Sequence, residues 1–309
     1  MTLAFYTAVR ISATQNIAHR IHINRNQMVN LSSYFKLETS LYPTSGLHFY
    51  VFDDKNSKNF VADCLVPFRE AYIANKEVER IVNDYSKSRE DVIQRRLPEK
   101  GKVMSGDFGE ILTFYLASQI WSPTANVLPM KWRFKDKKTE ASHYTDIMLF
   151  ELKDESNPSV DDALYTYEVK TRATDLSNDV YPTHKRKAFV TYKDGKTECT
   201  FIEAVVDANK DAVERAAETI PYLLTRCEDL GLKDLHDKIN RFSNPVSMTY
   251  RKEYNAVAVI DNSTLSEQMN RLPADLLLSH PNVGRVFCVP MDNLKEIYEK
   301  IYEEMPKNS

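Results

Sequence analysis

The pattern of apolar and polar residues separates the chain into two parts near residue 95. In the first part, alternation typical of a half-buried sheet predicts short strands over residues 4–11, 47–52 and 62–66. A helix is expected over residues 67–85, and the segment that follows, residues 86–102, is densely charged and carries Pro98 near its end. These features predict an N-terminal α/β region over residues 1–95 and a second domain over residues 96–309.

A buried amphipathic helix opens the second part. Its apolar side chains recur at helical spacing on one face, at Phe108, Ile111, Leu112, Tyr115, Leu116 and Ile120. Ser105 and Asp107 are candidate N-caps, and Glu110 is expected in the first turn of the helix. The spacing therefore predicts a packed helix that carries an acidic side chain near its buried face.

Beyond that helix, strands and helices alternate to the end of the chain. Strands are expected over residues 127–134, 146–150, 164–169, 187–192, 200–206, 256–260 and 284–290, and helices over residues 207–230 and 292–305. The strands 146–150 and 164–169 flank the hydrophilic segment 153–162, which we interpret as a solvated hairpin insertion. The pattern as a whole predicts an α/β protein.

Composition argues against several classes of protein. The chain has 309 residues, of which 42% are hydrophobic and 28% charged, enough for one large or two modest globular domains. Only 7 glycines are present, and the absence of a Walker-type loop and of a dinucleotide fingerprint argues against an ATPase or a dehydrogenase. The four cysteines are scattered and form no zinc-site or redox pair. Without a signal peptide or a membrane-length apolar run, a cytoplasmic protein that makes no membrane contact is expected.

The formal net charge of −3 provides no global basic field that would attract nucleic acid. Contact with DNA would then depend on a local patch or on a partner that brings the substrate. The best local patch consists of Arg172 with Lys185, Arg186 and Lys187, which could contact phosphates. A solvated loop explains these residues about equally well.

Three ionisable residues, Asp146, Glu168 and Lys170, are embedded in the alternating pattern of the predicted hairpin. Side chains two apart on a strand share a face, so Glu168 and Lys170 are neighbours, and the partner strand brings Asp146 beside them. Converging carboxylates repel each other unless a cation lies between them, and hard oxygen ligands suit Mg²⁺ or Mn²⁺. An ammonium beside a metal-bound water can position or deprotonate it, and Glu110 could bind a second metal ion or hold a metal-bound water.

A purely structural explanation of the same residues has to be weighed. Glu-x-Lys on a strand is by itself more typical of an exposed salt bridge than of an active site. That explanation predicts that Asp146 and Glu110 lie far from Glu168 and Lys170. The order along the chain favours a catalytic site, because a helix bearing Gly109-Glu110 followed by strands with Asp and then Glu-x-Lys has no simple structural explanation.

These residues resemble the motif of the PD-(D/E)XK nuclease superfamily, although Thr145 stands where the superfamily has its proline. The resemblance implies a restriction-endonuclease-like fold, in which helices flank a mixed sheet. It also implies that Asp146, Glu168 and Glu110 are metal ligands, that Lys170 is the catalytic lysine, and that the cofactor is Mg²⁺ or Mn²⁺.

Within that superfamily, the run of residues 105–112, together with the hairpin motifs, is similar to the HamA family, the effectors of Hachiman antiphage defence systems. The resemblance implies a bacterial nuclease that cleaves DNA. It also implies a partner, a superfamily-2 helicase of the HamB type, which holds the nuclease inactive until aberrant DNA is sensed. The alternative is a nuclease-derived scaffold without cleavage activity that serves as a regulatory subunit of a helicase complex.

Overall fold

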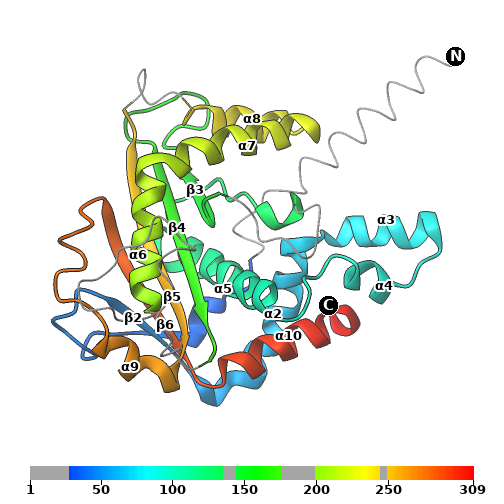
Figure 1. Cartoon of the computed structure of the whole chain (residues 1–309). Coiled ribbons are helices and arrows are strands. Elements are labelled where there is room, and N and C mark those ends of the chain that lie inside the picture. Colours follow the sequence, from blue (N-terminus) through cyan, green and yellow to red (C-terminus); the bar gives the residue numbers. More distant parts are fainter. Residues whose placement is uncertain (1–27, 135–143, 175–198, 244–248) are drawn as a thin grey trace, which may run out of the picture.

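The computed structural model describes residues 28–134, 144–174, 199–243 and 249–309, and its centre is a six-stranded mixed sheet (Figure 1). The strands are β1 (Phe35–Glu38), β2 (His48–Phe52), β3 (Ile147–Glu151), β4 (Ala163–Arg172), β5 (Arg251–Asp261) and β6 (Val283–Met291). In the order β1-β2-β6-β5-β4-β3, the four inner strands run parallel, and each edge strand pairs antiparallel with its neighbour. The strands that precede residue 95 therefore complete the same sheet as the strands that follow it.

Helices cover both faces of this sheet, as the predicted α/β class requires (Figure 1). One face is covered by α2 (Ser57–Tyr72), α5 (Lys102–Leu116) and α10 (Leu294–Asn308), with α3 (Asn75–Tyr85) and α4 (Arg89–Gln94) beside them. The other face carries α6 (Thr200–Lys210), α7 (Ala216–Asp229), α8 (Lys233–Asn240) and α9 (Leu265–Asn270). Short 3₁₀ helices lie at Leu31–Tyr34, Asp54–Asn56, Lys131–Phe134 and Asn262–Thr264, and π-helical turns at Ala117–Trp121 and Asp211–Arg215. This arrangement is consistent with a restriction-endonuclease-like fold.

No helix within the described ranges has both the length and the apolar character needed to cross a membrane.

Alternation along β4 decides which face of the sheet carries the acidic motif. Odd-numbered residues from Tyr165 to Val169 pack into the core beneath α2, α5 and α10. Even-numbered residues point to the opposite face, where Leu164 joins the core beneath α7 and α8. Glu168 and Lys170 therefore lie on the face that α6 and α7 cover.

Small residues allow helices of both layers to approach the sheet closely. Ala256 and Ala258 of β5 are fully buried in the core beneath α6. On the other face, a Cβ at Gly109 of α5 would stand 1.9 Å from Oγ1 and 3.2 Å from Cβ of Thr171 on β4. A side chain at this position would force Thr171 to shift. The close approach of α5 places the following residue, Glu110, beside the strand that carries the acidic motif.

Five of the ten predicted strands are confirmed. Predicted strands 47–52, 146–150, 164–169, 256–260 and 284–290 correspond to β2, β3, β4, β5 and β6. The expected helix 207–230 spans the end of α6, the π-helical turn and α7, and the expected helix 292–305 corresponds to α10. The segment 153–162 joins β3 to β4 as a largely exposed loop. The strands expected over residues 4–11 and 187–192 lie outside the described residues.

Three predicted strands are wrong. Residues 62–66 lie inside α2, and residues 200–206 form most of α6. In α2 the fully buried side chains Phe60, Cys64 and Phe68 recur every four residues, so helical packing overrides the local alternation. Residues 127–134 contribute only an isolated bridge from Val127 to Phe150 and then a 3₁₀ helix.

Two predicted helix boundaries are also wrong. The helix expected over residues 67–85 is divided, because α2 ends at Tyr72 and α3 begins at Asn75. Helix α5 begins directly after Gly101, whose φ of 117° suits a residue without a side chain. Ser105 and Asp107 are therefore inside α5 rather than caps, and Glu110 lies deeper in the helix than its first turn.

Replacement of Gly109 by alanine tests the close approach of α5 to β4. We expect Gly109→Ala to lower the free energy of unfolding by about 1–3 kcal/mol, because the added methyl group overlaps Thr171. Gly106→Ala is the matched control in the same helix, since a Cβ there meets nothing within 4 Å. It should be neutral or stabilise by about 0.5–1 kcal/mol. Denaturant unfolding measures both, and equal effects would contradict the proposed contact.

Candidate active site

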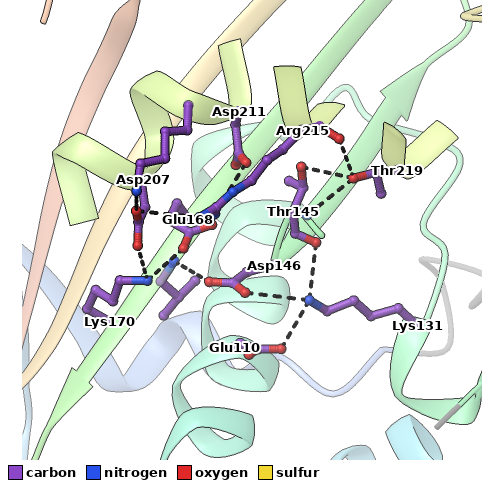
Figure 2. A network of polar contacts seen from close by, with 12 residues as sticks. Glu110, Lys131, Thr145, Asp146, Glu168, Lys170, Asp207, Asp211, Arg215 and Thr219 are labelled. Carbon is purple, nitrogen blue, oxygen red and sulfur yellow. Dashed lines mark hydrogen bonds and ion pairs between the residues drawn. The ribbon is translucent and has the colours of Figure 1, made fainter. Parts of the chain in front are cut away.

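The carboxylates of Asp146 and Glu168 are brought together by the pairing of β3 with β4. Ile147 lies opposite Tyr167 in the antiparallel register, and Asp146 and Glu168 are the next residues on the two chains. The backbone N–H of Val169 donates a hydrogen bond of 2.8 Å to Oδ2 of Asp146 (Figure 2). This bond fixes the Asp146 side chain against β4, beside Glu168 on the same face of the sheet.

Lys170 is held between two carboxylates. Its Nζ lies 2.7 Å from Oε1 of Glu168, two residues earlier on β4, and 2.8 Å from Oδ2 of Asp207 on α6. Burial alone would lower the pKa of Lys170, but the charges of Glu168, Asp146 and Asp207 reverse this and raise it. The lysine is therefore an ammonium donor fixed from both the strand and the covering helix.

Glu168 is the most deeply buried member of the predicted motif, with 2% of its surface exposed. Burial and, next, the Asp146 charge raise the pKa of Glu168 to about 7. Its Oε2 is buried and makes no hydrogen bond, and Arg215 Nη1 lies 3.4 Å away. One oxygen of this carboxylate therefore retains capacity for a further cation.

Glu110 reaches the site from α5 and meets the 3₁₀ helix that precedes β3. Lys131 Nζ lies 3.3 Å from Oε2 of Glu110 and 3.7 Å from Oδ1 of Asp146. Trp132 Nε1 donates a hydrogen bond of 3.0 Å to the same oxygen of Glu110. Burial opposes the charge of Lys131, but Glu110, Asp146 and Glu168 together raise its pKa. Lys131 thus joins the helix-borne acid to the strand-borne acids.

A second acidic group approaches from α6 and the π-helical turn that follows it. Asp207 contacts Lys170 and Lys210, which lower its pKa although burial acts in the opposite sense. Arg215 Nη2 lies 3.4 Å from Asp207 Oδ1, and its Nη1 lies 3.8 Å from Oδ1 of Asp211. A π-helical turn adds one residue to a helical circuit and often occurs at functional sites. Here it presents Asp211 and Arg215 to the motif on β4 (Figure 2).

Asp146 and Glu168 are the side chains that fit a divalent cation best. Both offer hard carboxylate oxygens, they come from paired strands, and Glu168 Oε2 is buried without a hydrogen bond. Among the described residues, no three Asp, Glu, His or Cys side chains are arranged as a group that could hold a metal. One or two carboxylates suffice for Mg²⁺, which usually keeps several of its waters.

The structure brings the four predicted residues Glu110, Asp146, Glu168 and Lys170 into one polar network (Figure 2). The purely structural explanation required Asp146 and Glu110 to lie far from the Glu-x-Lys pair, and they do not. Arg172 of the predicted basic patch is half-buried at the end of β4. The patch residues Lys185, Arg186 and Lys187 lie outside the described residues.

Sequence reasoning missed five charged residues of this network, namely Lys131, Asp207, Lys210, Asp211 and Arg215. Asp207, Asp211 and Arg215 follow one another at intervals of four, which places their side chains on one face of a helix. That spacing was a usable signal within the helix expected over residues 207–230. Lys131 gave no signal, because it lies in a segment that alternation assigned to a strand.

Comparisons with known proteins give one family. The model of the HamA family matches residues 30–305 of the chain, which include every residue of the network. The comparison with curated proteins found no match.

The buried aspartate of the π-helical turn should make stability depend on pH. Burial and the charges of Glu168 and Asp146 raise the pKa of Asp211 to about 8, whereas in the unfolded chain it is about 3.9. The proton on Asp211 therefore stabilises the folded state fully below about pH 4, and this contribution is lost as pH rises through about 8.

The Asn side chain of Asp211→Asn is neutral at every pH. We therefore expect the melting temperature of this variant minus that of the unsubstituted protein to increase as the pH is raised from 5 to 9. The measurement is calorimetric melting with a chelator present throughout. Asp234→Asn is the control, because the Asp234 side chain is 77% exposed on α8. A difference between Asp211→Asn and the parent that stays constant over this range would contradict the prediction.

Proposed function

The chain belongs to the HamA family, and from this premise we propose that it is a metal-dependent DNA nuclease, the effector of a Hachiman antiphage defence system. The observation that carries the proposal is the convergence of Asp146 and Glu168 from paired strands, with Lys170 held beside them. An acidic pair can hold a divalent cation, and an adjacent ammonium can orient water or stabilise charge, which suits metal-assisted hydrolysis of a phosphodiester.

Each residue of the motif has a distinct task in this proposal. Asp146 and Glu168 hold Mg²⁺ or Mn²⁺, and Glu110 assists from α5. The bound cation supplies Lewis-acid stabilisation of the scissile phosphate and lowers the pKa of its water. Orientation of the water and of the phosphate is assigned to side chains of the chain itself. The product is a DNA strand cut at a phosphodiester bond.

Lys170 acts in this scheme as a donor rather than as a base. Its Nζ lies within 2.8 Å of two carboxylates, Glu168 and Asp207, and this pairing favours the charged form. An ammonium orients a water molecule or a phosphate oxygen by hydrogen bonding, and it stabilises developing negative charge. Asp207 is then a positioning residue, because it acts on the reaction through Lys170.

Capture and control of DNA are assigned to a partner in this proposal. The chain has a formal net charge of −3 and no phosphate-binding loop, so neither long-range attraction of DNA nor ATP-driven work is expected of it alone. A superfamily-2 helicase of the HamB type would supply both. DNA contacts by Arg172, Lys185, Arg186 and Lys187 remain part of the proposal.

Substitution within the motif tests the nuclease activity. We expect the full chain to degrade plasmid DNA with Mg²⁺, and Glu168→Ala and Lys170→Ala to lower the rate about a hundredfold or more. Lys153→Ala is the matched control, since Lys153 pairs with the buried Glu151 at the opposite end of β3. Gel assays with and without chelator, and with and without a HamB-type helicase, measure the rates. Equal rates in all variants would refute the site, and no cleavage under any condition would favour the regulatory scaffold.

Substitution of Asp207 tests how Lys170 is positioned. We expect Asp207→Asn to lower the maximal cleavage rate about tenfold, because Lys170 loses one of its two anchoring carboxylates. The Mg²⁺ concentration for half-maximal activity should change little, since Asp207 is not assigned to the metal. Asp207→Glu, which restores the charge, should recover part of the rate. An Asp207→Asn protein that loses only thermal stability would assign the residue a structural role instead.

A further inference from the structure

Lys131 occupies the space between the helix-borne and strand-borne acids. It comes from the 3₁₀ helix Lys131–Phe134, and 9% of its surface is exposed. Its Nζ donates to the backbone carbonyl of Thr145 at 3.1 Å and lies 3.3 Å from Glu110 and 3.7 Å from Asp146. Figure 2 shows the ammonium directed at these three acceptors.

Of the two carboxylates that Lys131 joins, Asp146 is assigned above to the divalent cation, and Glu110 is the residue that assists it. Glu110 and Asp146 come from different elements, α5 and the residue before β3, and Lys131 is a charged side chain that contacts both. An ammonium and a divalent metal ion compete for the same carboxylate oxygens, because each neutralises them by direct contact. The ammonium of Lys131 and a metal ion therefore cannot contact the same oxygens of Glu110 and Asp146 at the same time.

A pocket adjoins Lys131 and Asp146, and its walls include Phe114, Tyr222 and Leu223. Lysine carries its point charge on a flexible four-carbon stem, whose methylene groups pack readily along apolar walls. Lys131 also donates to the backbone carbonyl of Thr145, an acceptor that is not one of the carboxylates assigned to the metal.

We propose that Lys131 is an exchangeable counter-ion that competes with the divalent cation for Glu110 and Asp146. This inference rests on the proposed nuclease function and adds a control of metal binding by the chain itself. With Lys131 in place the acids are compensated and affinity for the metal is reduced. A metal ion entering the site displaces the ammonium from Asp146 and Glu110.

Competition of this kind couples metal binding to DNA binding. A displaced ammonium needs a new anionic partner, and a phosphodiester brought to the site provides one. DNA therefore raises the affinity for the metal, and by reciprocity the metal raises the affinity for DNA. The chain then binds the metal ion weakly when no DNA is present.

The experiment measures Mn²⁺ binding to the full chain by isothermal titration calorimetry, without DNA. Lys131→Gln keeps an amide donor for the Thr145 carbonyl and removes the charge, and Lys131→Met removes both. We expect each to bind Mn²⁺ at least tenfold more tightly than the parent. Lys153→Gln, which removes a lysine paired with the buried Glu151 away from the site, should bind Mn²⁺ like the parent.

The outcomes separate this inference from the proposed function. Mn²⁺ binding that is equal or weaker in both Lys131 variants would overturn the competition, while binding lost in Asp146→Asn would still support the metal site. Binding absent in the parent and in every Lys131 variant would overturn the metal site itself. Failure of both Lys131 variants to show a cooperative melt would also overturn the inference, because Lys131 would then be a permanent structural ion.

Discussion

Mutual repulsion among buried carboxylates is the constraint on which the rest of the site depends. Acidic side chains converge there from three layers of the fold, and the cations that compensate them come from separate elements. The acids are Glu110, Asp146, Glu168, Asp207 and Asp211, and the cations are Lys131, Lys170, Lys210 and Arg215. At about 4 Å and an effective dielectric of about 20, one uncompensated pair of like charges costs about 4 kcal/mol. The 3₁₀ helix before β3 and the π-helical turn after α6 are therefore held to the site by ion pairs as well as by packing.

That constraint explains why the helices lie so close to the sheet at this end. The attraction between an acid and its compensating cation weakens with distance, so Glu110 on α5 must lie near the cations of the site. The absence of a side chain at Gly109 permits this close approach of α5 to β4. On the opposite face, Ala256 and Ala258 leave room for α6, which carries Asp207 to Lys170. Small residues on both sides of the sheet thus determine where the charged residues meet.

Alternation along residues 164–170 predicted that Glu168 and Lys170 share one face of a strand, although in the structure β3 and most of β4 are buried on both faces. Alternation failed where a short apolar run fits both the strand period of two and the helical period of 3.6. Residues 62–66 and 200–206 are such runs, and both are helical in the structure. Lys131 could not be predicted, since no local pattern distinguishes a lysine bound to distant carboxylates from a solvated one. Its role arises only when α5 and the start of β3 are brought together.

A net charge of −3 is compatible with the proposed nuclease function once charge is considered within the site rather than over the whole molecule. Here the lysines and the arginine already compensate most of the acidic charge, and burial further weakens ionisation, since the pKa of Glu168 is raised to about 7 and that of Asp211 to about 8. In the proposed function, a divalent cation that enters such a site adds positive charge that the local acids only partly cancel. The remaining charge suits a phosphodiester anion, so the reaction step needs no basic surface. Long-range attraction of DNA is a separate task, and a chain with a net charge of −3 leaves it to the proposed partner.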